Sequence, residues 1–172
     1  MKNVKFEVNF SKKGGFTQNG YDNIEFLISP NPGEALKPLA KIASGGETSR
    51  IMLALKDLLA EADGIETFVF DEIDAGVSGR TAQSVAEKLF SASKARQILC
   101  VSHLPQIAAM ADTHYLIEKK LEGGKTFTIV EKLARDSIIP EIARLISGAK
   151  ITETSLKTAE EMKQMADEIK AG

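Results

Sequence analysis

Three acidic residues and a histidine follow two apolar segments of the chain. Asp71, Glu72 and Asp74 come directly after the first segment, and His103 comes shortly after the second. Adjacent carboxylates at the end of a buried strand are costly unless a cation compensates them, and a hydrated Mg²⁺ on one carboxylate is a natural solution. Asp71 would then hold the metal, directly or through water. Glu72 could accept a proton from an attacking water.

Each of these signals also has a structural interpretation. Acidic residues commonly follow strands, so Asp71 and Glu72 are equally compatible with a solvated strand end. A single histidine such as His103 more often makes a structural hydrogen bond than it takes part in catalysis.

A glycine-rich segment forms the third chemical element. Ala43, Ser44, Gly45, Gly46 and Glu47 stand immediately before a stretch with helical periodicity. Glycines let the backbone approach a ligand closely. Free amides at a helix N-terminus, together with the Ser44 hydroxyl, make a site for an anion such as phosphate. The same residues would also serve as an ordinary loop and N-cap.

The elements that position these residues are two strands and a helix. Thr67–Phe70 and residues 98–101 are apolar without alternation, as expected of strands buried on both faces of a mostly parallel sheet. A helix with Val85 and Leu89 on its apolar side lies between them, which predicts a βαβ unit with a right-handed crossover. The carboxyl ends of both strands would share one edge, where ligands bind in open parallel sheets.

Flanking segments complete an α/β pattern. Residues 4–10 alternate as a half-buried strand, turns are expected at Gly14-Gly15 and Asn19-Gly20, and residues 24–28 form a second strand, giving a β-hairpin or meander over residues 1–30. Helical spacing predicts a helix over residues 47–62, stopped by Asp63-Gly64.

The C-terminal third predicts a second hairpin and two helices. Residues 115–118 and 127–130 flank Gly123-Gly124. A helix around residues 138–146 should end at Ser147-Gly148. A last helix should be capped by Thr154 or Ser155, with an apolar face made of Leu156, Ala159, Met162, Ala166 and Ile169.

Composition narrows the class of protein. A chain of 172 residues without a visible linker fits a single domain over residues 1–172. A net charge of −2 gives no long-range attraction for a polyanion, so this segment alone is not expected to bind nucleic acid strongly. The apolar runs are too short to cross a membrane, and no secretory signal is evident. The single cysteine, Cys100, fits a reduced cytoplasmic compartment.

Taken together in this order, the three motifs resemble the C-terminal part of ABC ATPase heads. In that family they are the signature loop, the Walker B strand with its catalytic glutamate, and the switch histidine. Residues 43–50, 70–80 and 101–112 are similar to the RecN family of SMC-like DNA repair proteins, whose head is split by a long coiled coil. The resemblance places the signature loop and helix in residues 43–62, the Walker B, D-loop and switch-histidine unit in 65–112, and a hairpin with C-terminal helices in 113–172.

The resemblance implies a role for each motif in ATP hydrolysis, because ABC heads sandwich two nucleotides between two subunits. Asp71 would support Mg²⁺, Glu72 would polarise the attacking water, and His103 would bind the γ-phosphate in cis. The signature residues that would contact ATP in trans are Ser44, Gly45, Gly46 and Glu47. Asp74 and Ser78 would lie in the D-loop at the dimer interface.

The sequence departs from the ABC pattern in several places. Ala43 and Glu47 replace the Leu and Gln of the general signature, and Ser78 stands where many relatives have Asp. No Gly-x-x-x-x-Gly-Lys followed by Ser or Thr occurs, so the phosphate loop is missing. The chain alone is therefore not expected to hydrolyse ATP.

The implied partners follow from the same resemblance. They are an N-terminal half of the same head that carries the phosphate loop, a second head that associates as a homodimer on ATP binding, and DNA bound through the full-length protein. Localisation would be cytoplasmic, with association to the nucleoid during repair.

Three other interpretations of the sequence remain open. A transporter ATPase would need its phosphate loop and helical subdomain before the signature, and about forty residues before Ser44 leave too little room. A non-enzymatic interaction module would use the same fold without catalysis. A metal-dependent hydrolase built on Asp71, Glu72, Asp74 and His103 would leave the Ser-Gly-Gly segment unexplained.

Overall fold

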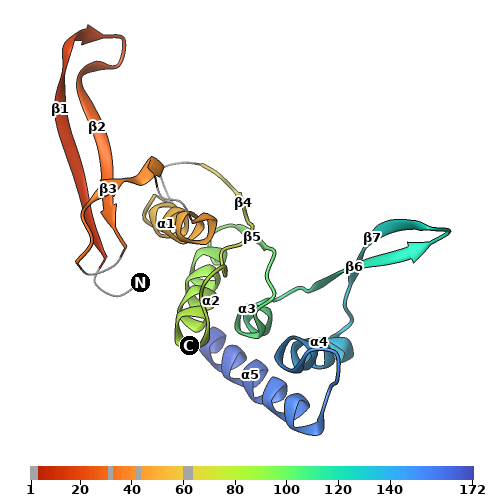
Figure 1. Ribbon diagram of the computed structural model, residues 1–172. Coiled ribbons are helices and arrows are strands. Elements are labelled where there is room, and N and C mark those ends of the chain that lie inside the picture. Colours follow the sequence, from red (N-terminus) through yellow and green to blue (C-terminus); the bar gives the residue numbers. More distant parts are fainter. Residues whose placement is uncertain (1–3, 31–32, 42–43, 60–63) are drawn as a thin grey trace.

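A computed structural model describes residues 4–30, 33–41, 44–59 and 64–172. Ala43, Ala62 and Asp63, which belong to the expected signature segment and helix end, lie outside these ranges. The elements in chain order confirm the α/β class (Figure 1): β1 (Lys5–Thr17), β2 (Gly20–Ser29), β3 (Lys37–Pro38), η1 (Leu39–Lys41), α1 (Gly45–Leu58), β4 (Thr67–Phe70), α2 (Gly79–Ser93), β5 (Gln97–Cys100), α3 (Pro105–Met110), β6 (Tyr115–Glu122), β7 (Lys125–Lys132), α4 (Arg135–Ser147) and α5 (Glu153–Ala171).

Strands β4 and β5 form the predicted βαβ unit with α2 between them. They pair in parallel, with Thr67 opposite Gln97 and Phe70 opposite Cys100. The backbone N–H of Val101 donates to Phe70 O at 2.9 Å, so the segments that follow β4 and β5 leave the sheet side by side. In the described residues the parallel pairing is limited to these two strands, and the other strands pair antiparallel.

The expectation that both strands are buried on both faces is wrong for this chain. Phe70 is buried and Phe68, Ile98 and Cys100 pack against the core, but the side chain of Val69 is 68% exposed and that of Leu99 is 46% exposed. An apolar run without alternation needs cover on both faces. The described part of the chain supplies that cover on one face, and the other remains an apolar surface.

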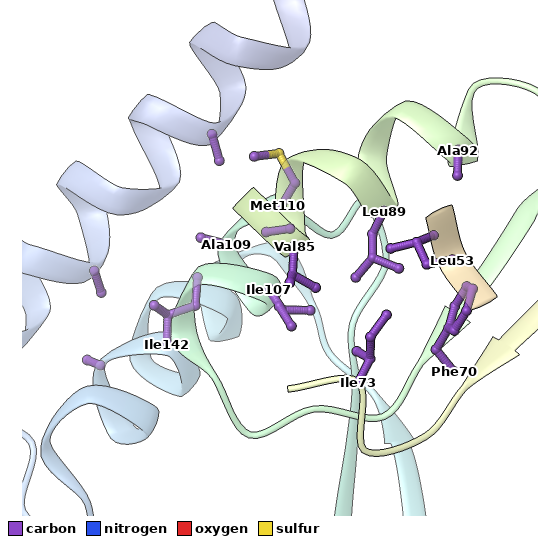
Figure 2. Close-up of a cluster of buried hydrophobic side chains, with 14 residues drawn as sticks. Leu53, Phe70, Ile73, Val85, Leu89, Ala92, Ile107, Ala109, Met110 and Ile142 are labelled. Carbon is purple, nitrogen blue, oxygen red and sulfur yellow. The ribbon is translucent and has the colours of Figure 1, made fainter. Parts of the chain in front are cut away.

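The hydrophobic core draws on β4 and all five helices. Figure 2 shows Phe70 and Ile73 facing Leu89 of α2, with Ile107 of α3 and Ile142 of α4 in the same cluster. Ile73 and Ile142 have no exposed surface. Burial of one such side chain is worth about 1.5 to 3 kcal/mol. Ile73 therefore anchors the acidic segment that follows β4.

Helix α1 is shorter than expected. It ends at Leu58, and the backbone N–H of the C-cap Leu59 donates to Leu55 O. Ile51 and Leu53 are buried, whereas Leu58 and Leu59 are exposed, so these last two residues do not continue the buried face.

The N-terminal hairpin is longer than the sequence suggested. The turn at Asn19-Gly20 is confirmed, since Thr17 pairs with Gly20 and Gly20 has a φ of 87°. The turn expected at Gly14-Gly15 is wrong, because β1 continues through both glycines. A register shift between Lys12 and Thr17 absorbs the irregularity instead, as a β-bulge does.

The apolar face of this hairpin is uncovered. The register places Phe6, Val8 and Phe10 opposite Ile28, Phe26 and Ile24, respectively. Ile28 is buried, but Phe10 is 66% exposed and the other four are exposed too. The strand expected at residues 4–10 is therefore confirmed as part of β1, but its expected half-burial is wrong for this chain. In Figure 1 the hairpin extends away from the helices.

The C-terminal elements largely match their prediction. Strands β6 and β7 form the expected hairpin across Gly123-Gly124. Helix α4 ends at Ser147, and its C-cap is Gly148, whose N–H donates to Arg144 O at 2.8 Å. The N-cap of α5 is Thr152 and not Thr154 or Ser155, because Ser155 occupies the third helical position of a capping box. None of the helices in the described ranges is long and apolar enough to cross a membrane.

Candidate functional site

An open pocket of about 250 Å³ lies at the edge where β4 and β5 end. It is lined by Asp71, Glu72, Asp74, Val101, Ser102 and His103. The structure thus brings together the three carboxylates and the histidine that the sequence singled out. Ser102 also lines the pocket, although the sequence analysis assigned it no role. Its position between the second strand and His103 is the sequence feature that could have indicated one.

Glu72 holds an unusual backbone conformation. Its φ is 56°, which makes it the one non-glycine residue with a left-handed backbone in the described ranges. Such a conformation costs on the order of 1 to 3 kcal/mol and persists where neighbouring contacts fix it. The buried side chain of Ile73 and the turn from Ala75 N–H to Glu72 O at 2.9 Å supply those contacts. Strain of this kind is typical of functional sites.

The Glu72 carboxylate reaches the first turn of α1. A Cβ built on Gly45 would lie 3.2 Å from Glu72 Oε2, so the two residues approach closely because Gly45 has no side chain. Both Asp71 and Glu72 have exposed side chains at the pocket. Their carboxylates are therefore accessible to a ligand.

Asp74 is buried and connects the two strand ends. Its side chain is 3% exposed, and Oδ2 accepts hydrogen bonds from Ser102 Oγ at 2.6 Å and from the His103 backbone N–H at 3.0 Å. The ring Nδ1 of His103 lies 3.2 Å from the same oxygen. Asp74, expected at a dimer interface, thus has its carboxylate engaged within this chain. Ser78 is exposed just before α2.

The signature segment forms the N-terminus of α1, as expected. Ser44 is the N-cap, and its Oγ accepts from the Glu47 backbone N–H at 3.4 Å. Gly46 is buried, and a Cβ on it would lie 2.6 Å from Ala75 O and 2.9 Å from the Ala75 side chain. The start of α1 therefore packs directly on the acidic loop after β4, and a residue larger than glycine does not fit there.

Arg50 ties α1 to that loop and was missed by the sequence reasoning. Its Nη1 donates to Ile73 O at 3.0 Å and to Ala75 O at 2.9 Å. Burial lowers the pKa of Arg50 from its usual value, although the charges of Glu47 and Asp74 oppose this. The sequence feature that could have indicated this role is a cation in the second turn of a helix that begins close to an acidic loop.

The donor set suits a metal ion that is shared with a phosphate ligand. Among the described residues no group of three or more His, Cys, Asp or Glu side chains is arranged to hold a metal on its own. Asp74 is occupied by Ser102 and His103, which leaves Asp71 and Glu72 as exposed carboxylates, with Asp71 directly at the strand end. Mg²⁺ is usually held by one or two carboxylates together with substrate phosphates and water. Asp71 fits that pattern.

The Cys100 thiol is expected to react slowly. Burial, with the nearby charges of Asp74 and Asp71, raises the pKa of Cys100 from 9.0 to about 12, and the thiolate is the reactive form. We expect alkylation at pH 8 to be about two to three orders of magnitude slower in the folded chain than in urea. Equal rates in the two conditions would show that the thiol is not protected.

The same shift also predicts how stability depends on pH. The pKa is higher in the folded state, so the contribution of Cys100 to stability is complete below pH 9 and is lost as the pH rises toward 12. We expect the free energy of unfolding, measured by urea titration at a series of pH values, to fall more steeply above pH 9 in the wild type than in Cys100→Ala. Parallel curves would contradict the shift.

Comparison with solved structures shows which known fold this chain shares. The chain is similar to the Smc head domain with a coiled coil and joint from Pyrococcus yayanosii, with a TM-score of 0.59, 19% identity, and coverage of 85% of this chain and 26% of that one. A chain from work on ATP-driven dimerisation and DNA-stimulated activation of SMC ATPases gives a TM-score of 0.51 and 19% identity, with 84% of each chain covered. The fold is that of an SMC-type ATPase head.

Sequence comparison identifies the relatives, although no protein-family model matches. DNA repair protein RecN of Halalkalibacterium halodurans is 50% identical over 99% of this chain, and RecN of Bacillus subtilis is 47% identical over 90%. RecN of Deinococcus radiodurans is 46% identical over 83%. The chain is a RecN homologue. It covers 31%, 27% and 25% of these relatives, respectively, and so spans about a third or less of their length.

Proposed function

We propose that this chain is the C-terminal part of an ATP-hydrolysing head in a RecN-type DNA repair protein. The observation that carries the proposal is the pocket at the β4–β5 edge, where Asp71, Glu72 and His103 meet. The signature segment at the start of α1 packs beside it. This arrangement provides the acidic, histidine and anion-binding groups that ATP hydrolysis needs from this part of a head.

Each pocket residue has a distinct task in this proposal. Asp71 would hold the Mg²⁺ that accompanies ATP, and that ion would supply positive charge beside the phosphates. Glu72 accepts a proton from the attacking water, since its carboxylate is exposed and lies beside the pocket. His103 points an exposed ring into the same space and contacts the γ-phosphate in cis.

The signature segment serves a second head. Backbone N–H groups in the first turn of α1 and the Ser44 hydroxyl would attract an anion. In the proposed dimer they contact the γ-phosphate bound by the partner head, with Gly45, Gly46 and Glu47 in the same loop. Ser78 then lies at the interface between heads, where its exposure leaves it accessible.

The phosphate loop comes from the N-terminal half of the same head. A two-stranded parallel sheet is marginal by itself, and β4 and β5 expose Val69, Leu99 and Val101 on one face. The β1–β2 hairpin exposes a second apolar face. Exposed apolar surfaces of this kind mark interaction sites, and the N-terminal half is the occupant we propose.

Contact with DNA belongs to the full-length protein in this proposal. The net charge of −2 gives this segment no electrostatic attraction for DNA. ATP-driven engagement of the heads would act on DNA ends through the remainder of the protein, in the cytoplasm and at the nucleoid.

The direct test is hydrolysis of Mg-ATP by this chain alone and after mixing with the N-terminal half of the same protein. We expect turnover in the mixture and none above background with either half alone, because the phosphate loop and the Walker B acids lie on different segments. A stably associated mixture without turnover would contradict the ATPase proposal and favour a binding module.

Ser44→Arg tests the role of the signature segment in trans. In the complete head we expect this variant to bind ATP as the wild type does but to lose ATP-induced association, because an arginine side chain fills the space of the partner's phosphate. Loss of the N-cap alone costs about 1 kcal/mol, so Ser44→Ala is the matched control. ATP binding and gel filtration are the measurements, and loss of ATP binding in Ser44→Arg would refute the assignment in trans.

A further inference from the structure

The buried carboxylate of Asp74 is placed to control the orientation of His103. One oxygen, Oδ2, receives the Ser102 hydroxyl at 2.6 Å and the His103 backbone N–H at 3.0 Å, and the ring Nδ1 lies 3.2 Å away. Ser102 Oγ in turn accepts from the Leu104 backbone N–H at 3.0 Å. This network joins the loop after β4 to the first residues after β5, so the carboxylate is fixed in place before any ligand binds.

The chemistry of the acceptor determines which ring nitrogen carries a proton. An ionised carboxylate accepts hydrogen bonds and cannot donate one, so Nδ1 of His103 must be protonated to face Asp74 Oδ2 favourably. Free histidine in its neutral form prefers the proton on the other nitrogen, Nε2. The site thus reverses the intrinsic preference. Nε2 is then the ring nitrogen left for the pocket, since the side chain of His103 is 75% exposed.

We propose that Asp74 is a positioning residue that holds His103 as the Nδ1–H form and aims Nε2 at the nucleotide phosphate. This inference rests on the proposed function for the identity of the ligand, but not for the state of the ring. A ring free to rotate or to exchange tautomers would present two nitrogens in many orientations. Asp74 reduces these to one, so that Nε2 meets a phosphate oxygen from a fixed direction, with one proton between the two atoms.

The second histidine of the chain provides an internal reference. His114 is buried, and its Nε2 lies 2.6 Å from Ala108 O. A carbonyl oxygen accepts only, so Nε2 of His114 must carry the proton. The chain has two histidines, and the structure assigns them opposite tautomers.

The test is long-range ¹H–¹⁵N NMR of the two imidazole rings in the 172-residue chain near pH 7.5. We expect the ¹⁵N shifts to report Nδ1–H for His103 and Nε2–H for His114. In Asp74→Leu, which is similar in size but has no acceptor, His103 should shift to the Nε2–H form, and His114 should stay unchanged as evidence of an intact fold. Ser102→Ala is the matched control, because it removes another donor to Asp74 and should leave His103 as Nδ1–H.

Two results would overturn the inference. One is an Nε2–H ring for His103 in the wild type. The other is an unchanged tautomer in Asp74→Leu when His114 reports a folded chain. Neither result depends on ATP, so this test can fail while the ATPase proposal stands, and the reverse is also true.

In the complete head, the consequence of Asp74→Leu should appear in nucleotide affinity as well. We expect KM for ATP to rise about tenfold, as when the partner that orients a functional histidine is lost. Ser102→Ala should change KM much less. Equal increases in the two variants would indicate a structural effect and count against a positioning role for Asp74.

Discussion

Glu72→Gln in the complete head is expected to lower ATP turnover by about 100-fold or more while ATP-induced association of the heads is preserved. A positioned general base typically contributes 10² to 10⁴ in rate, and glutamine cannot accept the proton. The exposed Glu72 carboxylate lines the pocket, and glutamine matches its size, so binding contacts should survive. Steady-state ATPase assays and gel filtration with ATP measure the two effects.

A control separates the role of the carboxylate from that of the strained backbone. Glu72→Gly removes both the carboxylate and the steric cost of a φ of 56°. It should be inactive like Glu72→Gln. A glycine substitution in ordinary backbone lowers the free energy of unfolding, but Glu72→Gly should not, because glycine adopts this φ without steric cost. Wild-type turnover in Glu72→Gln would remove Glu72 from the role of base.

Gly46→Ala is expected to destabilise the chain by about 1 to 3 kcal/mol, as overpacking of a tight interior does. The added Cβ would lie 2.6 Å from Ala75 O and 2.9 Å from the Ala75 side chain. The first of these neighbours is backbone, so α1 or the acidic loop must move. Urea unfolding of the isolated chain measures the loss, and turnover of the complete head should fall with it.

Alanine substitutions at two other glycines are the controls for this prediction. Gly15→Ala adds a Cβ in open space and should change stability little. Gly45→Ala meets the end of the Glu72 side chain at 3.2 Å, which can move, so its effect should be smaller than that of Gly46→Ala. Equal stabilities for Gly46→Ala and Gly15→Ala would contradict the tight packing of α1 on the loop.

The location of the site was predictable from the sequence because it depends on local rules. Unbroken apolar runs predict strands, a helix between them predicts parallel pairing, and parallel strands end at one edge. These rules place Asp71, Glu72 and His103 at one edge of the sheet. In the structure all three line one pocket. The N-cap role of Ser44 followed from its place before a helical pattern.

Features that depend on tertiary contacts could not be predicted in this way. Asp74 resembles Asp71 in sequence, yet its carboxylate faces inward, because Ser102 and His103 lie next to it only after β4 and β5 pair. Likewise, the apolar run of β4 indicates that cover is needed without indicating what supplies it. The exposure of Val69 therefore appears only in the structure.

The packing of Gly46 on Ala75, with Arg50 bonded to the carbonyls of Ile73 and Ala75, has a consequence for allostery between paired heads. In the proposed dimer, a nucleotide contacted by Ser44 in trans would restrain the same loop that presents Glu72 to the nucleotide bound in cis. The two sites would then be energetically linked, and by thermodynamic reciprocity each would change the affinity of the other by the same factor. We expect that factor to be favourable, because a loop already restrained by one nucleotide loses less freedom when the second one binds. Binding isotherms for ATP should accordingly be sigmoidal, with a Hill coefficient above one.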